Sequence, residues 1–154
     1  MVKRTIILLV LSALSTSFAA CNKETEEDRV RKVIAGMQKA VEEKQVTAVL
    51  EHVSRSYQDP QGNNYDGIKG IFAFYFLRHR AVSVSIPSLD ITVTNDMARV
   101  VFQAILAGRE GGESAGAILP DALGVYQFNV VLRKEGDAWK VLSATWDRLG
   151  DAPR

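Results

Sequence analysis

Few residues of this sequence have the type and spacing that a catalytic or metal site requires. The 154-residue chain has one cysteine, Cys21, and two histidines, His52 and His79, which lie far apart. These residues do not have the spacing of a zinc site, and no glycine-rich phosphate loop, nucleophile elbow or cysteine–histidine pair occurs. Any chemistry would therefore depend on carboxylates, tyrosines or a histidine acting as acids and bases, without a metal or cofactor.

The position of Cys21 indicates where the protein is delivered. A short basic start precedes an apolar run at residues 5–14, and mostly small residues follow it up to Ala20. About ten apolar residues are too few to span a bilayer, which needs roughly 20. Residues 1–20 are therefore predicted to be a secretory signal peptide that is removed from the mature protein.

The cysteine also ends a recognisable motif. Phe18-Ala19-Ala20-Cys21 resembles the lipobox of bacterial lipoproteins, although leucine is usual where Phe18 stands. The resemblance implies a diacylglyceryl group on the Cys21 sulfur, cleavage before this residue and acylation of the new amine. The alternative is an ordinary secretory signal that leaves a free thiol. We favour the lipid, because disulfides form in an oxidising envelope and no second cysteine is present.

The residues after Cys21 are expected to form a tether and then one domain. Segment 21–28 is polar and acidic, so it is predicted to link the lipid to the fold. Residues 29–149 have the length of a single domain, and 150–154 form a tail. Without the two basic residues of the signal, the chain has one more acidic than basic side chain. This near-neutral charge does not indicate the basic surface that nucleic-acid binding requires.

Helices are predicted first and strands after them. Apolar residues recur at helical spacing over 26–44 and again towards His79, with a turn-rich segment before the latter. A short helix lies between, for which Thr47 is the expected cap, and Asp66 is the expected cap of the third helix. Later apolar residues alternate, and this period predicts long antiparallel strands. They cover 82–93 with a bend at Pro87, 98–107, 126–132 and 139–146. The order predicts an α+β fold.

Three segments resemble the nuclear transport factor two-like superfamily. They are YQDPQGNNYDG before a helix, TNDMARVVF across a hairpin, and the closing GDAWKVLSATW. The resemblance covers residues 26–149 and rests on turn and strand patterns rather than on a catalytic signature. It implies that the N-terminal helices pack in the concavity of a strongly bent antiparallel sheet, as a cone-shaped roll with a pocket. A cystatin-like or other helix-on-sheet roll is the alternative.

In enzymes of that superfamily, carboxylates, tyrosines or histidines project into the cone. Asp59, in the segment that would enter the cone, is the best acid–base candidate, because an apolar wall raises the pKa of a carboxyl. We favour the alternative that it is a turn carboxylate that binds its own backbone. The candidates for lining a ligand pocket are Tyr57, Tyr65, Phe72, Tyr75, Phe76, His79 and Tyr126. Tyrosines more often fill cores, and a histidine at this place is more often packed at a helix end. His52 is a weaker candidate.

The strand at 98–107 is apolar on both faces in its central part. Antiparallel sheets commonly leave one face wet, so a second apolar face suggests an interface. Val101, Ile105 and Val131 are the interface candidates, for a homodimer or a protein partner in the envelope. The alternative is that the connection at 108–124 folds back and covers them.

The two tryptophans of the last strand bear on the same question. The numbers of Trp139 and Trp146 differ by an odd number, so an unbroken strand places them on opposite faces. One is therefore expected in the core and the other on the outer face, where it would extend the apolar patch.

Three functions remain open. We favour a lipid-anchored envelope protein that faces the periplasm and binds a small apolar ligand or a partner protein without catalysis. The outer membrane is expected rather than the inner, because Asn22 stands where inner-membrane lipoproteins often carry aspartate. The second function is a small isomerase or lyase that uses Asp59 or a tyrosine, and the third is a structural accessory lipoprotein with a filled cone. A buried carboxylate with a raised pKa would favour the enzyme.

Overall fold

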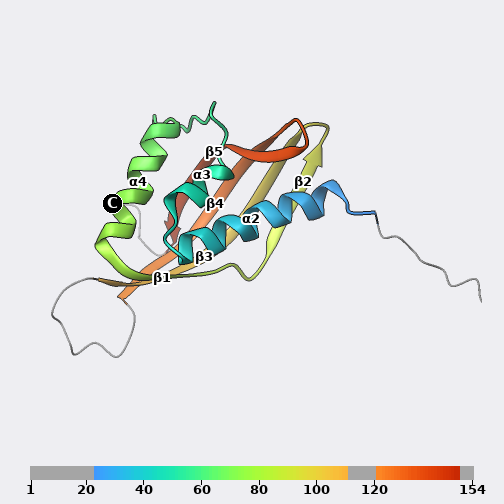
Figure 1. Ribbon diagram of the computed structural model, residues 1–154. Coiled ribbons are helices and arrows are strands. Elements are labelled where there is room, and N and C mark those ends of the chain that lie inside the picture. The colour runs from blue at the N-terminus through green and yellow to red at the C-terminus, as the bar shows by residue number, and fades with distance from the viewer. Residues whose placement is uncertain (1–22, 111–120, 150–154) are drawn as a thin grey trace, which may run out of the picture.

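The structure, a computed structural model, describes residues 23–110 and 121–149. The predicted signal peptide, Cys21, the middle of the 108–124 connection and the tail at 150–154 lie outside these residues. Within them three helices precede five strands, as Figure 1 shows. The elements are α2 (Glu26–Glu42), α3 (Val46–Glu51), α4 (Tyr65–Arg78), β1 (His79–Ser85), β2 (Leu89–Thr94), β3 (Met97–Glu110), β4 (Asp121–Glu135) and β5 (Ala138–Leu149).

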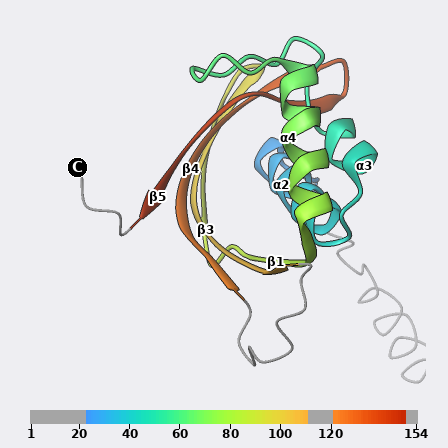
Figure 2. The same cartoon turned by 90° about the vertical axis from the view of Figure 1, so that its left-hand side faces the viewer.

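All five strands belong to one antiparallel sheet in the order β1-β3-β4-β5, with β2 also paired to β3. β2 pairs with residues 97–102 of β3 and β1 with 105–110, so the two strands follow one another along the same side of β3. Pro87 lies in the break between them, where it removes no ladder hydrogen bond. Figure 2 shows the sheet curving around the helices. The predicted fold class, helices packed in the concavity of a bent antiparallel sheet, is confirmed.

The core lies between α2 and the concave face of the sheet. Val30 of α2, Val100 of β3 and Leu132 of β4 have no exposed surface, as expected when apolar burial drives the packing. Polar residues of α2 cover the free edge of β1. Gln38 donates to the Val84 carbonyl at 2.8 Å, and the Val84 amide donates to Glu42 at 2.9 Å. None of the described helices is long and apolar enough to cross a membrane.

Both predicted helix caps are wrong. Thr47 lies inside α3, and Gln45 precedes that helix without a side-chain cap bond. Asp66 lies in the first turn of α4, whose cap is Asn64; its side chain accepts from the Gly67 amide at 2.9 Å. Asn and Asp are favoured almost equally as caps. Because Asn64 and Asp66 lie only two residues apart, the residue types alone do not show which of them caps α4.

α2 begins at Glu26, where the helical period over 26–44 predicts it, and so overlaps the predicted tether at 21–28. Thr25 caps α2 in a reciprocal arrangement with Asp28, in which each side chain accepts from the other residue's amide at 3.1 Å. The acidic residues 26–28, expected in the tether, therefore form the first turn of α2. Negative charge stabilises a helix at this end. The polar stretch between Cys21 and the fold shortens to a few residues.

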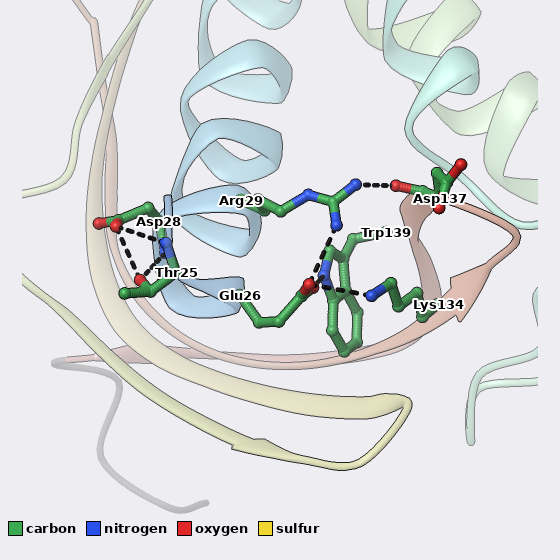
Figure 3. Close-up of polar contacts among 7 residues, drawn as sticks. All are labelled: Thr25, Glu26, Asp28, Arg29, Lys134, Asp137 and Trp139. Carbon is green, nitrogen blue, oxygen red and sulfur yellow. Dashed lines mark hydrogen bonds and ion pairs between the residues drawn. The ribbon is translucent and has the colours of Figure 1, made fainter. Parts of the chain in front are cut away.

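The same end of α2 is joined to the hairpin between β4 and β5, as Figure 3 shows. Glu26 accepts from the Lys134 ammonium at 2.9 Å and from the Trp139 indole N–H at 2.7 Å. Arg29 donates to the backbone carbonyl of Asp137. The hydrogen bonds from Lys134 and Trp139 are the main reasons why the pKa of Glu26 falls to about 2.

This pKa predicts how the join responds to acid. A carboxylate whose pKa is lower in the folded than in the unfolded state stabilises the fold above its unfolded pKa and loses that contribution as the pH falls. For Glu26 the loss is expected between its ordinary pKa of 4.5 and about pH 2. Wild type should therefore be more stable than Glu26→Gln at pH 7, and urea unfolding should show that this difference shrinks below pH 4. A constant difference would contradict the ionic role of Glu26.

A β-bulge overturns the prediction for the tryptophans. Leu142 has no partner in β4, although the residues on both sides of it do. Because side chains alternate between faces, one extra residue moves all later side chains to the other face. Trp139 is 3% exposed and Trp146 packs against the same core. Both therefore lie on the concave side, and neither extends an outer patch.

Candidate ligand site at the aromatic end of the cone

Near the junction of α4 and β1, two buried polar atoms find no hydrogen-bond partner among the described residues. They are the Tyr75 hydroxyl oxygen and His79 Nδ1. The residues lie one helical turn apart, and their ring centroids are 4.5 Å apart. Leaving such a group unsatisfied costs about 1–3 kcal/mol. Buried polar atoms of native proteins are nearly always satisfied by protein, ordered water or a ligand, so this pair is the leading candidate for a binding site.

The backbone holds His79 between two elements. Its amide donates to the Tyr75 carbonyl at the end of α4, while its own backbone is extended and opens β1. It pairs with Glu110 of β3, and the register is irregular before Ala81. The sequence predicts His79 at the end of the helical apolar stripe, and the structure places it one residue beyond the helix. The side chain is 4% exposed.

Aromatic side chains of the sheet form a second group. Phe102 and Phe128 stack with centroids 5.2 Å apart, and Tyr126 and Trp146 lie 6.3 and 6.5 Å from Phe128. Burial, and then the nearby Tyr126, raise the pKa of Tyr75. The Tyr75 hydroxyl therefore stays protonated at neutral pH.

α4 also contributes two phenylalanines next to Tyr75. Phe72 and Phe76 lie with ring centroids 5.7 Å apart, and the Phe76 ring meets the edge of Tyr75 at 6.5 Å. Phe76 is buried in a small cluster with Ala40 and Val49, whereas Phe72 is only partly buried. Of the predicted pocket residues, His79 and Phe76 pack against the Tyr75 ring, Phe72 packs against Phe76, and Tyr126 belongs to the aromatic group on the sheet.

Asp59 lies elsewhere, in the turn before α4. It is buried, and it accepts from the Tyr57 hydroxyl at 3.0 Å and from the Asn63 amide at 2.8 Å. Burial acts to raise the pKa of Asp59, but hydrogen bonds from Asn63 and Tyr57 outweigh it and lower the pKa. A carboxylate held ionised in this way orders its own turn and is a poor proton acceptor near neutral pH.

The remaining candidates are also separate from the pair. Tyr57 is buried with its hydroxyl on Asp59, and burial is the main cause that raises its pKa. Tyr65 is half-buried under the Arg55 guanidinium, 4.2 Å from the ring centroid, in cation–π geometry. His52 is half-buried at the end of α3, and burial lowers its pKa.

The described carboxyl groups with a clear pKa shift do not shift in the direction expected of a general base that works near neutral pH. Each described carboxyl group with a clear shift has a lowered pKa: Glu26, Asp28, Asp59 and Glu135. In the same part of the chain no group of three His, Cys, Asp or Glu residues is placed to hold a metal.

Two open depressions lie along α2, away from the aromatic site. The first has a volume of about 560 Å³ and is lined mainly by charged residues such as Asp28, Arg31 and Lys32. The second, of about 450 Å³, reaches from α2 to Trp139 and Lys140. Neither borders Tyr75 or His79. Both are wide open to solvent and bordered largely by charged side chains, whereas ligand sites are usually concave and enclose most of the ligand.

The predicted interface residues lie on the convex face of the sheet. Ile105 is 48% exposed, and Val101 and Val131 are half-buried. Val101 is paired with Asn129, which in turn is paired with Thr145. Polar residues therefore alternate with the valines across the strands, and the outer patch is less continuous than β3 alone suggests.

Comparison with known proteins identifies the fold. Neither a protein-family model nor a curated protein sequence matches the chain. Solved structures do match. A proposed dehydratase of the nuclear transport factor two-like family from Streptomyces avermitilis superposes with a TM-score of 0.71 at 12% identity, over 83% of this chain and 99% of that one. The domain has the nuclear transport factor two-like fold.

Two further structures share this fold. A proposed aromatic ring hydroxylase from Novosphingobium aromaticivorans matches with a TM-score of 0.67 at 18% identity, over 82% of this chain and 92% of that one. Bd1075 from Bdellovibrio bacteriovorus matches with a TM-score of 0.68 at 13% identity, over 82% of this chain. The match spans only 43% of Bd1075. At these identities the nuclear transport factor two-like fold is shared, whereas the activities named belong to those proteins.

Proposed function

We propose that the protein is a lipid-anchored envelope protein whose domain binds a small, largely apolar molecule that carries a hydrogen-bonding group. The observation that carries the proposal is the pair of unpaired buried atoms, the Tyr75 hydroxyl and His79 Nδ1, beside aromatic side chains. Known small-molecule sites have this composition, a mainly apolar wall with a few polar groups that fix orientation.

The chemistry of the pair limits the ligand. The Tyr75 hydroxyl remains protonated, so it donates to an acceptor such as a carbonyl oxygen. A neutral imidazole has one nitrogen that donates and one that accepts, so His79 Nδ1 can serve a neighbouring donor or acceptor. Phe72 and Tyr126 offer ring faces and edges to a flat apolar body.

One observation favours a second function, catalysis by an isomerase or lyase. His79 is a buried imidazole beside a tyrosine, and such a pair can move a proton on a bound carbonyl compound. The matched structures from Streptomyces avermitilis and Novosphingobium aromaticivorans described above are also proposed enzymes. Binding remains the better-supported proposal, because every shifted carboxyl group described has a lowered pKa.

The anchor half of the proposal rests on the sequence before the fold. The apolar run, the small residues and the single cysteine are arranged as in a lipoprotein precursor. The structure adds that α2 is capped at Thr25. At ~3.3 Å per extended residue, the few residues between would hold the domain close to the lipid surface.

Tyr75→Phe tests the binding half. Within residues 23–110 and 121–149 the ligand-free hydroxyl has no partner, so removing it is expected to leave the stability unchanged or to raise it by up to about 1 kcal/mol. Binding of 2-acetylnaphthalene, an aromatic ketone, is expected to weaken about tenfold, by the loss of one hydrogen bond. Thermal unfolding and fluorescence titration measure the two effects.

The matched probe is 2-ethylnaphthalene, which lacks the carbonyl group. Its affinity should be the same for wild type and Tyr75→Phe, since it offers the hydroxyl no acceptor. Absence of saturable binding for both probes would contradict the proposal. So would a clear loss of stability in Tyr75→Phe, which would give the hydroxyl a structural role.

A further inference from the structure

The outward side of α4 is unusually apolar. Leu77 is 91% exposed and Phe74 is 68% exposed, more than any other large apolar side chain described, and Ile71 beside them is also exposed. The opposite side of the helix, with Ile68 and Phe76, is buried. In Figure 2, α4 lies in front of α2, on the side of the molecule that faces the viewer. Exposed apolar surface of this kind usually marks an interaction site.

Two glycines of α4 lie on the same side of the helix as Phe74 and Leu77. Gly67, Gly70, Phe74 and Leu77 are spaced by three, four and three residues, which places them on one seam of a helix. Neither glycine has a positive φ. A Cβ on Gly70 would meet nothing within 4 Å, and one on Gly67 would come no closer than 3.4 Å to Asn63. Glycine weakens a helix interior, and nothing within the fold requires it here.

We infer that this seam binds the same seam of a second copy of the chain, with the two α4 helices antiparallel. Antiparallel alignment sets Phe74 of each copy against Gly70 of the other, and Leu77 against Gly67. Large side chains then fill the space that the glycines leave. A two-fold interface must be self-complementary in this way, and the seam has its two small residues in one half and its two large ones in the other.

The charges of α4 favour the same orientation. Asp66 lies in the first turn and Arg78 in the last. An antiparallel pair brings opposite charges and opposite ends of the helix dipoles together, whereas a parallel pair brings like charges together. A parallel pair would also set glycine against glycine and leave voids that forfeit packing.

The expected dimer is weak in dilute solution. Two helices of this length bury less than the roughly 1,200–2,000 Å² of a stable complex. Attachment of both copies to one membrane would raise their effective concentration. The inference does not depend on the aromatic ligand site, which lies on the inward side of α4.

Cysteine cross-linking tests the pairing in the full-length chain. The wild-type background keeps the anchor, because the proposed function, on which this test rests, has the only native cysteine, Cys21, acylated; an introduced thiol is then the only free one. Ala73 is exposed on the seam flank near the expected two-fold axis, so Ala73→Cys should give a covalent dimer with a short thiol cross-linker. Asp66→Cys, at the end of the helix, should give much less. Val101→Cys reports on the alternative, pairing through the convex face of the sheet.

Gly70→Gln provides the decisive second variant. It fills the proposed gap, yet it replaces glycine by a better helix former in open space, so the fold is expected to remain intact by circular dichroism and thermal unfolding. Cross-linking of Ala73→Cys should fall at least about tenfold in this variant, and also with Leu77→Gln. The inference is overturned if Ala73→Cys cross-links no better than Asp66→Cys, if Gly70→Gln leaves the yield unchanged, or if only Val101→Cys cross-links.

Discussion

Replacement of Cys21 by serine is expected to move the protein from the membrane to the aqueous fraction or to leave it as an uncleaved precursor. The sulfur is the acceptor of the first acyl groups, and serine offers no thiolate. Each buried methylene contributes about 0.8 kcal/mol to membrane attachment, so several acyl chains hold a protein nearly irreversibly. Detergent phase separation of cell extracts measures the change as an almost complete transfer between phases.

Asn22→Asp is the matched control for this experiment. It leaves the acceptor intact, so the protein should stay in the detergent phase, while the lipoprotein resemblance predicts a shift from the outer to the inner membrane. Wild-type protein in the aqueous phase would refute the lipid anchor. That result would leave the proposal for Tyr75 and His79 untouched.

Trp139→Ala is expected to lower the free energy of unfolding by about 3–5 kcal/mol, the range for truncation of a large buried aromatic side chain. Trp139 is almost fully buried, and its indole N–H donates to Glu26 at 2.7 Å. The substitution therefore opens a cavity and also removes one of the bonds between α2 and the hairpin. Chemical denaturation monitored by circular dichroism measures the loss.

Two variants separate these effects. Trp139→Phe retains most of the ring volume and loses the donor, so it should cost less than Trp139→Ala. Leu77→Ala removes a large apolar side chain that is exposed, and it should change the stability of the monomer by no more than about 0.5 kcal/mol. Equal losses for Trp139→Ala and Leu77→Ala would contradict the described core.

The general fold was predictable because its signals are strong and repeated. The helical period of α2 continues over several turns, and the strands alternate over long runs. The break at Pro87 also falls where the sequence places it. The caps were less predictable, because Asn64 and Asp66 are both good cap residues and only the backbone geometry selects the first.

The sequence could not predict which face of the sheet each side chain of β5 occupies, nor the candidate site. Both depend on contacts between residues that are far apart in the sequence. The bulge at Leu142 has no mark in the local sequence, yet it decides which side of the sheet Trp146 occupies. The sequence does place Tyr75 and His79 on one side of a helix. Whether their polar atoms have hydrogen-bond partners depends on residues of β3 and β4, which are distant in the sequence. The local sequence pattern therefore does not predict it.

The bonds at Glu26 have a mechanical consequence. A pull on the chain ahead of Thr25 enters the domain at the first turn of α2. Because Glu26 is bonded to Lys134 and Trp139, the load divides between the helix and a hairpin of the central sheet, and these contacts must shear before the helix can unwind. A protein dragged by its N-terminus would therefore keep its fold under tension for longer than a helix end held by its cap alone.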